Sequence, residues 1–364
     1  GYYHPIALYE YDDAGQLIAE AHGYSNEVWG YTYDAGGNIT SKNKLDYNDV
    51  IVEDVDNPYF DNLDTTEPLD TIEYGYDNKY KDLLVSFDGE TITHDDAGNP
   101  LNYHGYTIGG ETSMNFSWAG RNLVEAVTQD GDSKFKYTYD ASGLRTEKAI
   151  YEKETFTIAT TDTNGNPTTE SKSEFIKSCT IEYVWSNGMI VAQKVSTYSP
   201  VKDENGYYIM DGNEVAVVEN DNSVIVKPLY NDFNEPLGVN CYITTEDGEK
   251  SETFYFIKDA QGNVRSIYSM ENDYTINMNY DAFGNYSLGL SGNAIDEMQN
   301  SIINANGELN QIVAGIVVGI AMTVMVCITF TAAPHSYRGY IYDIETGLYY
   351  CQSRYYSPSW GRFI

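Results

Sequence analysis

Residues that could carry catalysis are few in this chain, and they form no familiar catalytic pattern. No GxSxG, HExxH or P-loop motif occurs. Zinc sites need clustered Cys and His ligands, whereas the five His are scattered and the Cys form no CxxC pair. We therefore predict no metal site and no cofactor. The four Cys, irregularly spaced, are Cys179, Cys241, Cys327 and Cys351. The remaining chemistry to consider is a pair of carboxylates that share a proton.

Most of the recognisable Asp residues belong to a repeated pattern, Tyr-Asp-x-x-Gly-Asn. Copies begin at Tyr11, Tyr33, Tyr139 and Tyr280, and weaker ones at His94 and Lys258, in units of about 21 or 22 residues. An Asp accepts hydrogen bonds from amides two residues on, and Gly accepts a positive φ. Each unit thus predicts a β-hairpin, and stacked hairpins predict a continuous sheet. The predicted turn residues are Asp34, Gly37, Asp140, Gly143, Asp259, Gly262, Asp281 and Gly284.

Composition supports a β-rich chain and excludes some partners. The 364 residues include 35 Tyr and 31 Gly, which favours many short strands with tight turns. Acidic residues outnumber basic ones 55 to 21, so the net charge is −34. Nucleic acid is therefore an unsuitable partner, because phosphate binding needs clustered Lys and Arg. The sequence begins with Gly1 inside the repeat pattern, so we expect it to be a fragment of a longer protein.

The spacing of the repeats divides the chain into five parts. Repeats occupy 1–149, elaborated hairpins 150–253, and further repeats 254–286. An insertion follows at 287–335, and a C-terminal motif occupies 336–364. Residues 46–70 are rich in Asp and Glu and predict a solvent-exposed acidic loop.

The insertion contains a long uncharged segment. Its first half has apolar residues near helical spacing, and the 22 residues from Ile312 to Ala333 carry no charge. As a helix they would span about 33 Å, which suits a bilayer. A membrane-active segment and a buried core segment both fit. A resting membrane anchor fits less well, because repeats resume directly afterwards. The membrane-active candidates are Ile312, Gly315, Gly319, Val324 and Phe330.

The C-terminal stretch Tyr337–Ile364 resembles the Rhs-repeat-associated core motif. It contains Tyr342-Asp343, Gly347-Leu348-Tyr349-Tyr350 and Gly361-Arg362-Phe363. The preceding units resemble the Rhs/YD repeats of bacterial polymorphic toxins, insecticidal toxin complexes and teneurins. The resemblance implies an all-β fold, in which a spiral antiparallel sheet of β-hairpin repeats forms a hollow shell. It implies a secreted or cell-surface bacterial protein whose partners are a C-terminal toxin cargo in cis and upstream YD repeats. The uncharged segment adds a target membrane as a candidate partner, and the acidic charge balance argues against nucleic acid.

Many members of this family cut themselves near the core motif, with chemistry resembling that of aspartyl proteases. The family pattern has an Asp where this chain has Ser357, and a second Asp beyond Gly-Arg-Phe, past Ile364. The pair is therefore incomplete, and we assign no catalytic residue. We expect Asp343 to be a repeat turn residue rather than a substitute catalyst. The residues that match the processing motif, or replace it, are Arg354, Tyr355, Tyr356, Ser357, Pro358, Gly361, Arg362 and Phe363.

Three functions from different classes follow from these patterns. The leading hypothesis is the C-terminal segment of a toxin shell, which encapsulates and presents a toxin domain. The alternative is a cell-surface YD-repeat module for adhesion or carbohydrate binding through Tyr faces. The third is a processing enzyme of the aspartyl type, which would need a second Asp supplied from beyond Ile364.

Overall fold

The computed structural model describes residues 7–22, 27–52, 58–107, 110–211, 216–245, 248–269, 274–292 and 337–364. These residues are almost entirely β-strands, which confirms the predicted all-β antiparallel class. Within these ranges no helix is long and apolar enough to cross a membrane. The membrane-active candidates, and the helical part predicted for the insertion, lie outside the described residues.

The chain divides into two compact units. Unit 1 contains residues 1–104 and the turn 281–285, and unit 2 contains 105–280 and 286–364. Unit 1 is built on a seven-stranded sheet in which neighbours along the chain pair in order. Its strands are β1 (Ala7–Tyr11), β2 (Leu17–His22), β3 (Glu27–Tyr33), β4 (Ile39–Leu45), β7 (Asp70–Tyr76), β8 (Leu84–Phe87) and β9 (Glu90–Thr91).

Residues 46–70 of unit 1 only partly match the predicted acidic loop. They contain α1 (Tyr47–Val50) and the paired strands β5 (Ile51–Val52) and β6 (Tyr59–Phe60). Val50 and Ile51 are buried in a cluster with Ala21, Val28 and Leu45. The segment thus adds to the core of unit 1, while most of its acidic side chains are exposed.

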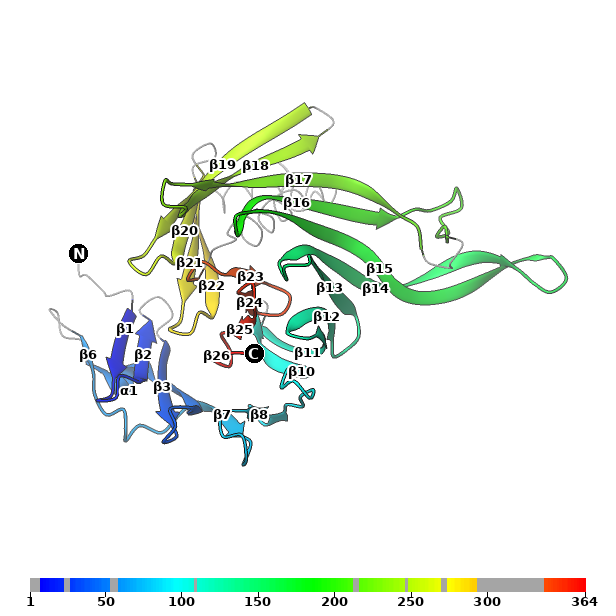
Figure 1. Ribbon diagram of the computed structural model, residues 1–364. Helices are drawn as coiled ribbons and strands as arrows, with labels where there is room; N and C mark the ends of the chain where they lie inside the picture. Colours follow the sequence, from blue (N-terminus) through cyan, green and yellow to red (C-terminus); the bar gives the residue numbers. More distant parts are fainter. Residues whose placement is uncertain are drawn as a thin grey trace, which may run out of the picture. The chain divides into compact units, whose positions relative to one another are not determined.

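A 13-stranded antiparallel sheet, β10 to β22 in sequence order, dominates unit 2 (Figure 1). Long strands β14 and β15 occupy the region predicted to hold elaborated hairpins. The strands are β10 (Asn102–Thr107), β11 (Gly110–Ala119), β12 (Asn122–Thr128), β13 (Ser133–Tyr139), β14 (Arg145–Thr161), β15 (Pro167–Ser186), β16 (Met189–Pro200), β17 (Val218–Tyr230), β18 (Pro236–Thr245), β19 (Gly248–Lys258), β20 (Val264–Ser269), β21 (Tyr274–Tyr280) and β22 (Tyr286–Gly292).

A small four-stranded sheet packs against the 13-stranded one. It consists of β23 (Ile341–Asp343), β24 (Leu348–Tyr350), β25 (Tyr355–Ser357) and β26 (Arg362–Phe363). We call residues 337–364 the core motif. Figure 1 shows it in red between β20–β22 on one side and β11–β13 on the other. Contacts of Tyr337 with Tyr280 on β21 and of Ser359 with Tyr106 on β10 agree with this placement.

The repeat turns have the geometry expected of the Tyr-Asp-x-x-Gly pattern. Asp34 accepts hydrogen bonds from the N–H groups of Gly36 and Asn38 at 2.8 and 2.9 Å, and Gly37 has φ +85°. Its strand pair shifts register just before the turn. This is a type I turn followed by a glycine bulge, a common three-residue hairpin. The same Asp bonds and positive-φ Gly occur at Asp140/Gly143, Asp259/Gly262 and Asp281/Gly284.

At four positions, the Tyr that precedes the turn joins its hairpin to an earlier one. The Tyr33 hydroxyl donates to the carbonyl of Leu17 at 2.7 Å, and the Tyr139 hydroxyl to that of Leu123 at 2.7 Å. Each accepting carbonyl lies directly after the preceding turn. Tyr76 with Ile39 and Tyr230 with Ile190 repeat the bond at 2.8 Å. We call these contacts inter-hairpin tyrosine bonds, and they give the repeated Tyr a structural role.

Candidate functional site

The candidate site is the buried surface where the core motif meets β13–β15. Leu348 and Tyr349 have no exposed area, and Tyr350 and Tyr355 are 1% exposed. A four-stranded sheet this small cannot bury its own side chains, so the larger sheet must supply the covering surface. The core motif is therefore an interior element of unit 2.

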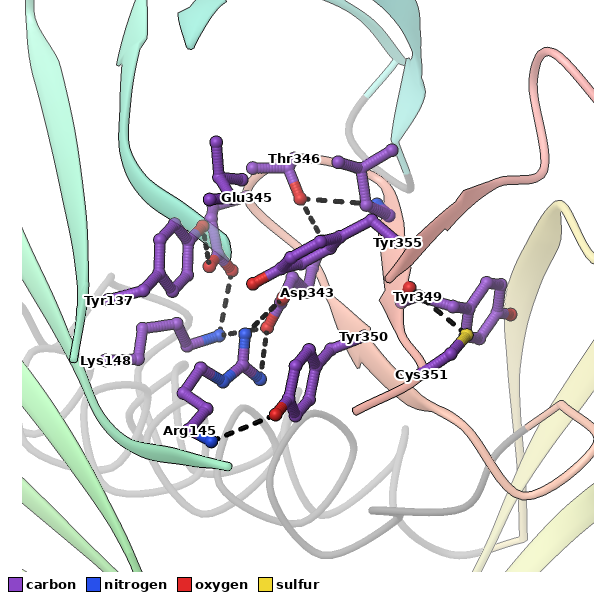
Figure 2. Close-up of polar contacts among 12 residues, drawn as sticks. Tyr137, Arg145, Lys148, Asp343, Glu345, Thr346, Tyr349, Tyr350, Cys351 and Tyr355 are labelled. Carbon is purple, nitrogen blue, oxygen red and sulfur yellow. Dashed lines mark hydrogen bonds and ion pairs between the residues drawn. The ribbon is translucent and has the colours of Figure 1, made fainter. Parts of the chain in front are cut away.

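Four charged side chains join the motif to the large sheet, and we call them the ion network (Figure 2). Arg145 from β14 donates two bonds to the Asp343 carboxylate, Nη1 to Oδ2 at 2.6 Å and Nη2 to Oδ1 at 3.0 Å. Lys148 Nζ lies 3.1 Å from Asp343 Oδ1 and 3.0 Å from Glu345 Oε2. The Tyr137 hydroxyl donates to Glu345 Oε1 at 3.0 Å. Two cations thus face two carboxylates across about 200 residues of chain.

Arg145 occupies a position that is apolar in other repeats. It lies five residues after Asp140, where the hairpins of Asp12 and Asp34 have Leu17 and Ile39. Such a position points into the packed face, and Arg145 is fully buried there. Its backbone is held on both sides, because its N–H donates to the Tyr350 hydroxyl and its carbonyl accepts from the Trp185 indole. Trp185 forms the bond that Tyr forms in other repeats.

Aromatic rings line the ion network. The Arg145 guanidinium lies 4.5 Å from the ring centre of Tyr350, 5.0 Å from that of Tyr183 and 5.4 Å from that of Tyr137. Cation–π contacts of this kind strengthen when water is excluded. Burial raises the pKa of Tyr137 and Tyr355 well above the usual value, so both phenols stay neutral. The Tyr355 hydroxyl pairs with that of Tyr139 at 2.7 Å.

The charges in the network balance one another. Burial alone would raise the pKa of Asp343, but Arg145 and Lys148 outweigh it and lower the pKa below the usual range. Burial acts against the charged form of Lys148 as well, and the neighbouring Glu345 and Asp343 reverse this and raise its pKa. Arg145, Lys148 and Asp343 are therefore charged at neutral pH, and Lys148 also pairs with Glu345. Such a set can hold two segments together, and it is not a carboxyl pair sharing a proton.

A second contact fixes the other side of the core motif on β10. The Tyr106 N–H donates to Ser359 Oγ at 2.9 Å. Gly347 has φ +71°, and a side chain there would place its Cβ 2.4 Å from the Tyr106 carbonyl oxygen. Only Gly therefore allows this approach. The motif is held by polar contacts on β10 and on β14.

The processing-motif residues lie on the last two strands and their turn. Ser357 has no exposed area, and its Oγ accepts from the Trp360 N–H at 3.1 Å. The Pro358 carbonyl accepts from Gly361 N–H, and Gly361 has φ +65°. Arg354 stacks over the Phe363 ring at 4.0 Å. Through β25 and β26, Tyr356 pairs with Phe363 and Ser357 with Arg362. Ser357 thus caps a turn, and the carboxylates nearest in sequence, Asp343 and Glu345, are both ion-paired.

The predicted turn residues are not brought together into one site. Each acts within its own hairpin, although Asp281 also lies 3.2 Å from Lys42 within unit 1. Among the residues that the structure describes, no cluster of His, Cys, Asp and Glu could hold a metal ion. The expected turn role of Asp343 needs correction. Its carbonyl accepts turn bonds from Thr346 and Gly347, but its carboxylate binds Arg145 and Lys148.

Fold and site define a YD-repeat protein, a stack of Tyr-Asp hairpins that buries a Tyr-rich C-terminal motif. A model of the RHS repeat matches residues 11–44. The chain is 23% identical, over 286 residues, to the tRNA3(Ser)-specific nuclease WapA of Bacillus spizizenii. That match covers 77% of this chain and 8% of the relative. The chain is an Rhs/YD-repeat protein, and it spans under a tenth of the length of this curated relative.

Solved structures of toxin complexes are also similar to this chain at low identity. One is TcdB2-TccC3 without its hypervariable C-terminal region, with 12% identity, 98% of this chain and 20% of that chain covered, and a TM-score of 0.25. Another is the Tc holotoxin pore of Photorhabdus luminescens, with 13% identity, 98% and 17% covered, and a TM-score of 0.24. These TM-scores are too low to compare arrangements, so the fold described above stands on its own strand order.

Proposed function

We propose that this chain is the C-terminal shell segment of an Rhs-type toxin, and that its core motif holds and presents a toxin domain that follows in the parent protein. The observation that carries the proposal is the complete burial of the Arg145–Asp343 pair between β14 and the core motif. A surface adhesion module would not need its last strands anchored inside the sheet. A segment that must keep a cargo in place would.

The chemistry of the anchor suits a cargo carrier. Ion pairs and tyrosine hydroxyls are directional, so they fix where the motif ends and where the following chain starts. A net charge of −34 favours a basic cargo over an acidic one. In this proposal the protein is secreted or displayed on a bacterial surface, and its partners are the cargo in cis and further upstream repeats.

The test uses the full-length parent protein that contains this chain. Encapsulation predicts that the toxin region resists protease under native conditions, while the same region made alone is degraded. Intact mass under denaturing conditions then shows whether the parent is cut. We expect one uncut chain unless a carboxylate beyond Ile364 completes the pair. A toxin region that is digested equally fast in both forms would contradict encapsulation and favour the adhesion module.

The uncharged segment Ile312–Ala333 supports a membrane role as a further part of the proposal. It lies outside the described residues, so its sequence alone supports this role. A peptide covering residues 295–335 is expected to permeabilise lipid vesicles. A peptide of the same length with charged residues at Gly315 and Val324 is expected not to. Equal leakage from both, or from neither, would remove the membrane role and leave the shell role intact.

A further inference from the structure

Strands β14 and β15 continue beyond their sheet neighbours as a two-stranded ribbon. Pairing of β14 with β13 ends at Glu152, and pairing of β15 with β16 begins at Cys179. Between these points β14 and β15 pair only with each other, as far as Thr161 and Pro167. We call residues 153–178 the arm. Figure 1 shows it extending past the other strands of unit 2, at the right of the view.

One face of the arm is covered and the other is exposed. Phe156 and Ile176 are buried in a small cluster with Ala216, and Phe156 stacks on Tyr208 with ring centres 4.2 Å apart. The opposite face presents Thr157 and its cross-strand neighbour Ser171, both exposed. A ribbon of two strands is marginally stable in water, and an additional strand would stabilise it.

The two long edges of the arm differ in how they are protected against pairing. The β15 edge begins with Pro167 and carries Glu170, Lys172 and Glu174, which are typical devices against edge-to-edge association. The β14 edge from Thr155 to Thr161 contains neither a charge nor a proline. Its β-branched, uncharged sequence is that of a strand which accepts a partner.

The hydrogen-bonding groups of that edge point outward at alternate residues. The Lys153 N–H donates to the Asp132 carbonyl at 2.7 Å, on the β13 side of the strand. Alternate residues direct their backbone groups to the same side, so Thr155, Thr157 and Ala159 present theirs to the open edge. No strand in the described part of the chain pairs with this edge.

We propose that the β14 edge pairs with the same edge of a second copy of this chain, antiparallel, with Thr157 on the two-fold axis. A two-fold contact requires a self-complementary surface, and this register provides one. Phe156 would face Ile158 of the partner subunit, a favourable aromatic–aliphatic pair. Glu154 would lie opposite Thr160 of the partner subunit, so no like charges meet. Lys153 already pairs with Asp132 on this side, so the contact ends at Glu154. A strand of another protein would not be matched to this edge residue by residue, which favours a second copy of this chain.

The test measures the mass of the intact chain in solution against concentration, at about 0.15 M salt, where the Debye length is about 8 Å and long-range repulsion is screened. The mass is expected to rise from 40.9 kDa toward twice that value. Thr157→Pro removes an outward N–H without removing a β14–β15 bond, and it is expected to leave a monomer. The matched control is Ser171→Pro, directly across the ribbon on the protected edge, and it is expected to keep the dimer.

A charge exchange at the axis tests the register. Thr157→Lys and Thr157→Glu would each place like charges opposite one another, so each variant alone is expected to be monomeric. An equimolar mixture of the two is expected to form a mixed dimer. A wild-type chain that stays at 40.9 kDa at every concentration would overturn the proposal. Loss of the dimer in Ser171→Pro would show that the β14 edge is not the contact. Absence of a mixed dimer would show that Thr157 does not lie on the two-fold axis.

Discussion

The Arg145–Asp343 pair shows that one buried side chain can fix the position of a whole segment in this fold. A buried ion pair is weak support for stability in general, because desolvation offsets much of the attraction. Its effect here is one of position. The Arg145 guanidinium donates two hydrogen bonds that fit a carboxylate in one orientation. Both go to the Asp343 carboxylate. The core motif is therefore held in one register against β14.

Arg145→Met is expected to destabilise unit 2 by about 3–5 kcal/mol, because it leaves a buried carboxylate with only Lys148 to neutralise two anions. Chemical denaturation followed by tryptophan fluorescence measures this change. The double variant Arg145→Met with Asp343→Leu keeps the neutral Lys148–Glu345 pair and is expected to lose less than the single variant. A double variant that loses the sum of the two single effects would show that the pair does not interact.

The lowered pKa of Asp343 predicts a specific acid response. A carboxyl with a lowered folded-state pKa adds stability above its unfolded value, and this stability is lost as the pH falls through the folded value. Asp343→Asn lacks this contribution. The difference in unfolding free energy between wild type and Asp343→Asn is therefore expected to be constant near neutral pH and to shrink below about pH 4. A difference that stays constant to pH 2 would contradict the pairing.

The sequence predicted the turn residues well and the ion network not at all, for a physical reason. Asp34 and Gly37 act on atoms within four residues, so their local pattern contains the whole interaction. Arg145 meets Asp343 only after the sheet has formed. A signal did exist, because Arg145 stands in a position that is Leu17 or Ile39 in other repeats. Asp343 stands in a turn pattern, and that pattern gave no indication that its carboxylate would bind Arg145.

At the scale of elements, the inter-hairpin tyrosine bond explains why Tyr precedes the turn Asp. A Phe would fill the same space but would leave the carbonyl after the preceding turn without its donor. Burial raises the pKa of Tyr33 and Tyr230 to about 12, so each hydroxyl keeps its proton and donates at any ordinary pH. Each bond joins successive hairpins, and stacking thus rests on hydrogen bonds as well as on apolar contact.

Tyr230→Phe is expected to lower the free energy of unfolding by about 1 kcal/mol, since the Ile190 carbonyl loses its side-chain donor. Tyr255→Phe is the control, because Tyr255, on β19 of the same sheet, is 42% exposed. Its hydroxyl is accessible to water, so no measurable change is expected there. Equal effects of the two substitutions on denaturant midpoints would show that the bond to Ile190 contributes nothing.

The acidic segment 46–70 shows where sequence reasoning at the element scale is limited. Its charges predicted an exposed loop, and most of them are exposed. Val50 and Ile51 nevertheless enter the core of unit 1, and the partly buried Tyr47, Phe60 and Leu63 pack against them. A few apolar residues thus anchor a segment whose charges face water. Average composition cannot reveal such an anchor, whereas the position of single apolar residues can.

At the scale of the whole molecule, the described contacts predict an order of local stability. The core motif has every residue of β23 and β24 buried and is tied to β10 and β14, whereas the end of the arm pairs on one side only. Amides in buried, fully paired strands open rarely, and those in exposed ribbons open often. Backbone amides of the core motif should therefore exchange more slowly than those of the arm, although both segments belong to unit 2.

Hydrogen exchange followed by mass spectrometry measures that order in the intact chain. In solution dilute enough for the chain to be monomeric, peptides covering residues 341–357 are expected to exchange slowly, and those covering 157–173 quickly. Arg145→Met removes the guanidinium that binds Asp343, so it is expected to speed exchange in residues 341–357. Strands β2–β4 belong to unit 1, and their exchange is expected to stay unchanged, which makes them the internal control. If the core motif exchanged as fast as the arm in the wild-type chain, it would not be an anchored interior element, and the basis for its role in holding a cargo would be lost.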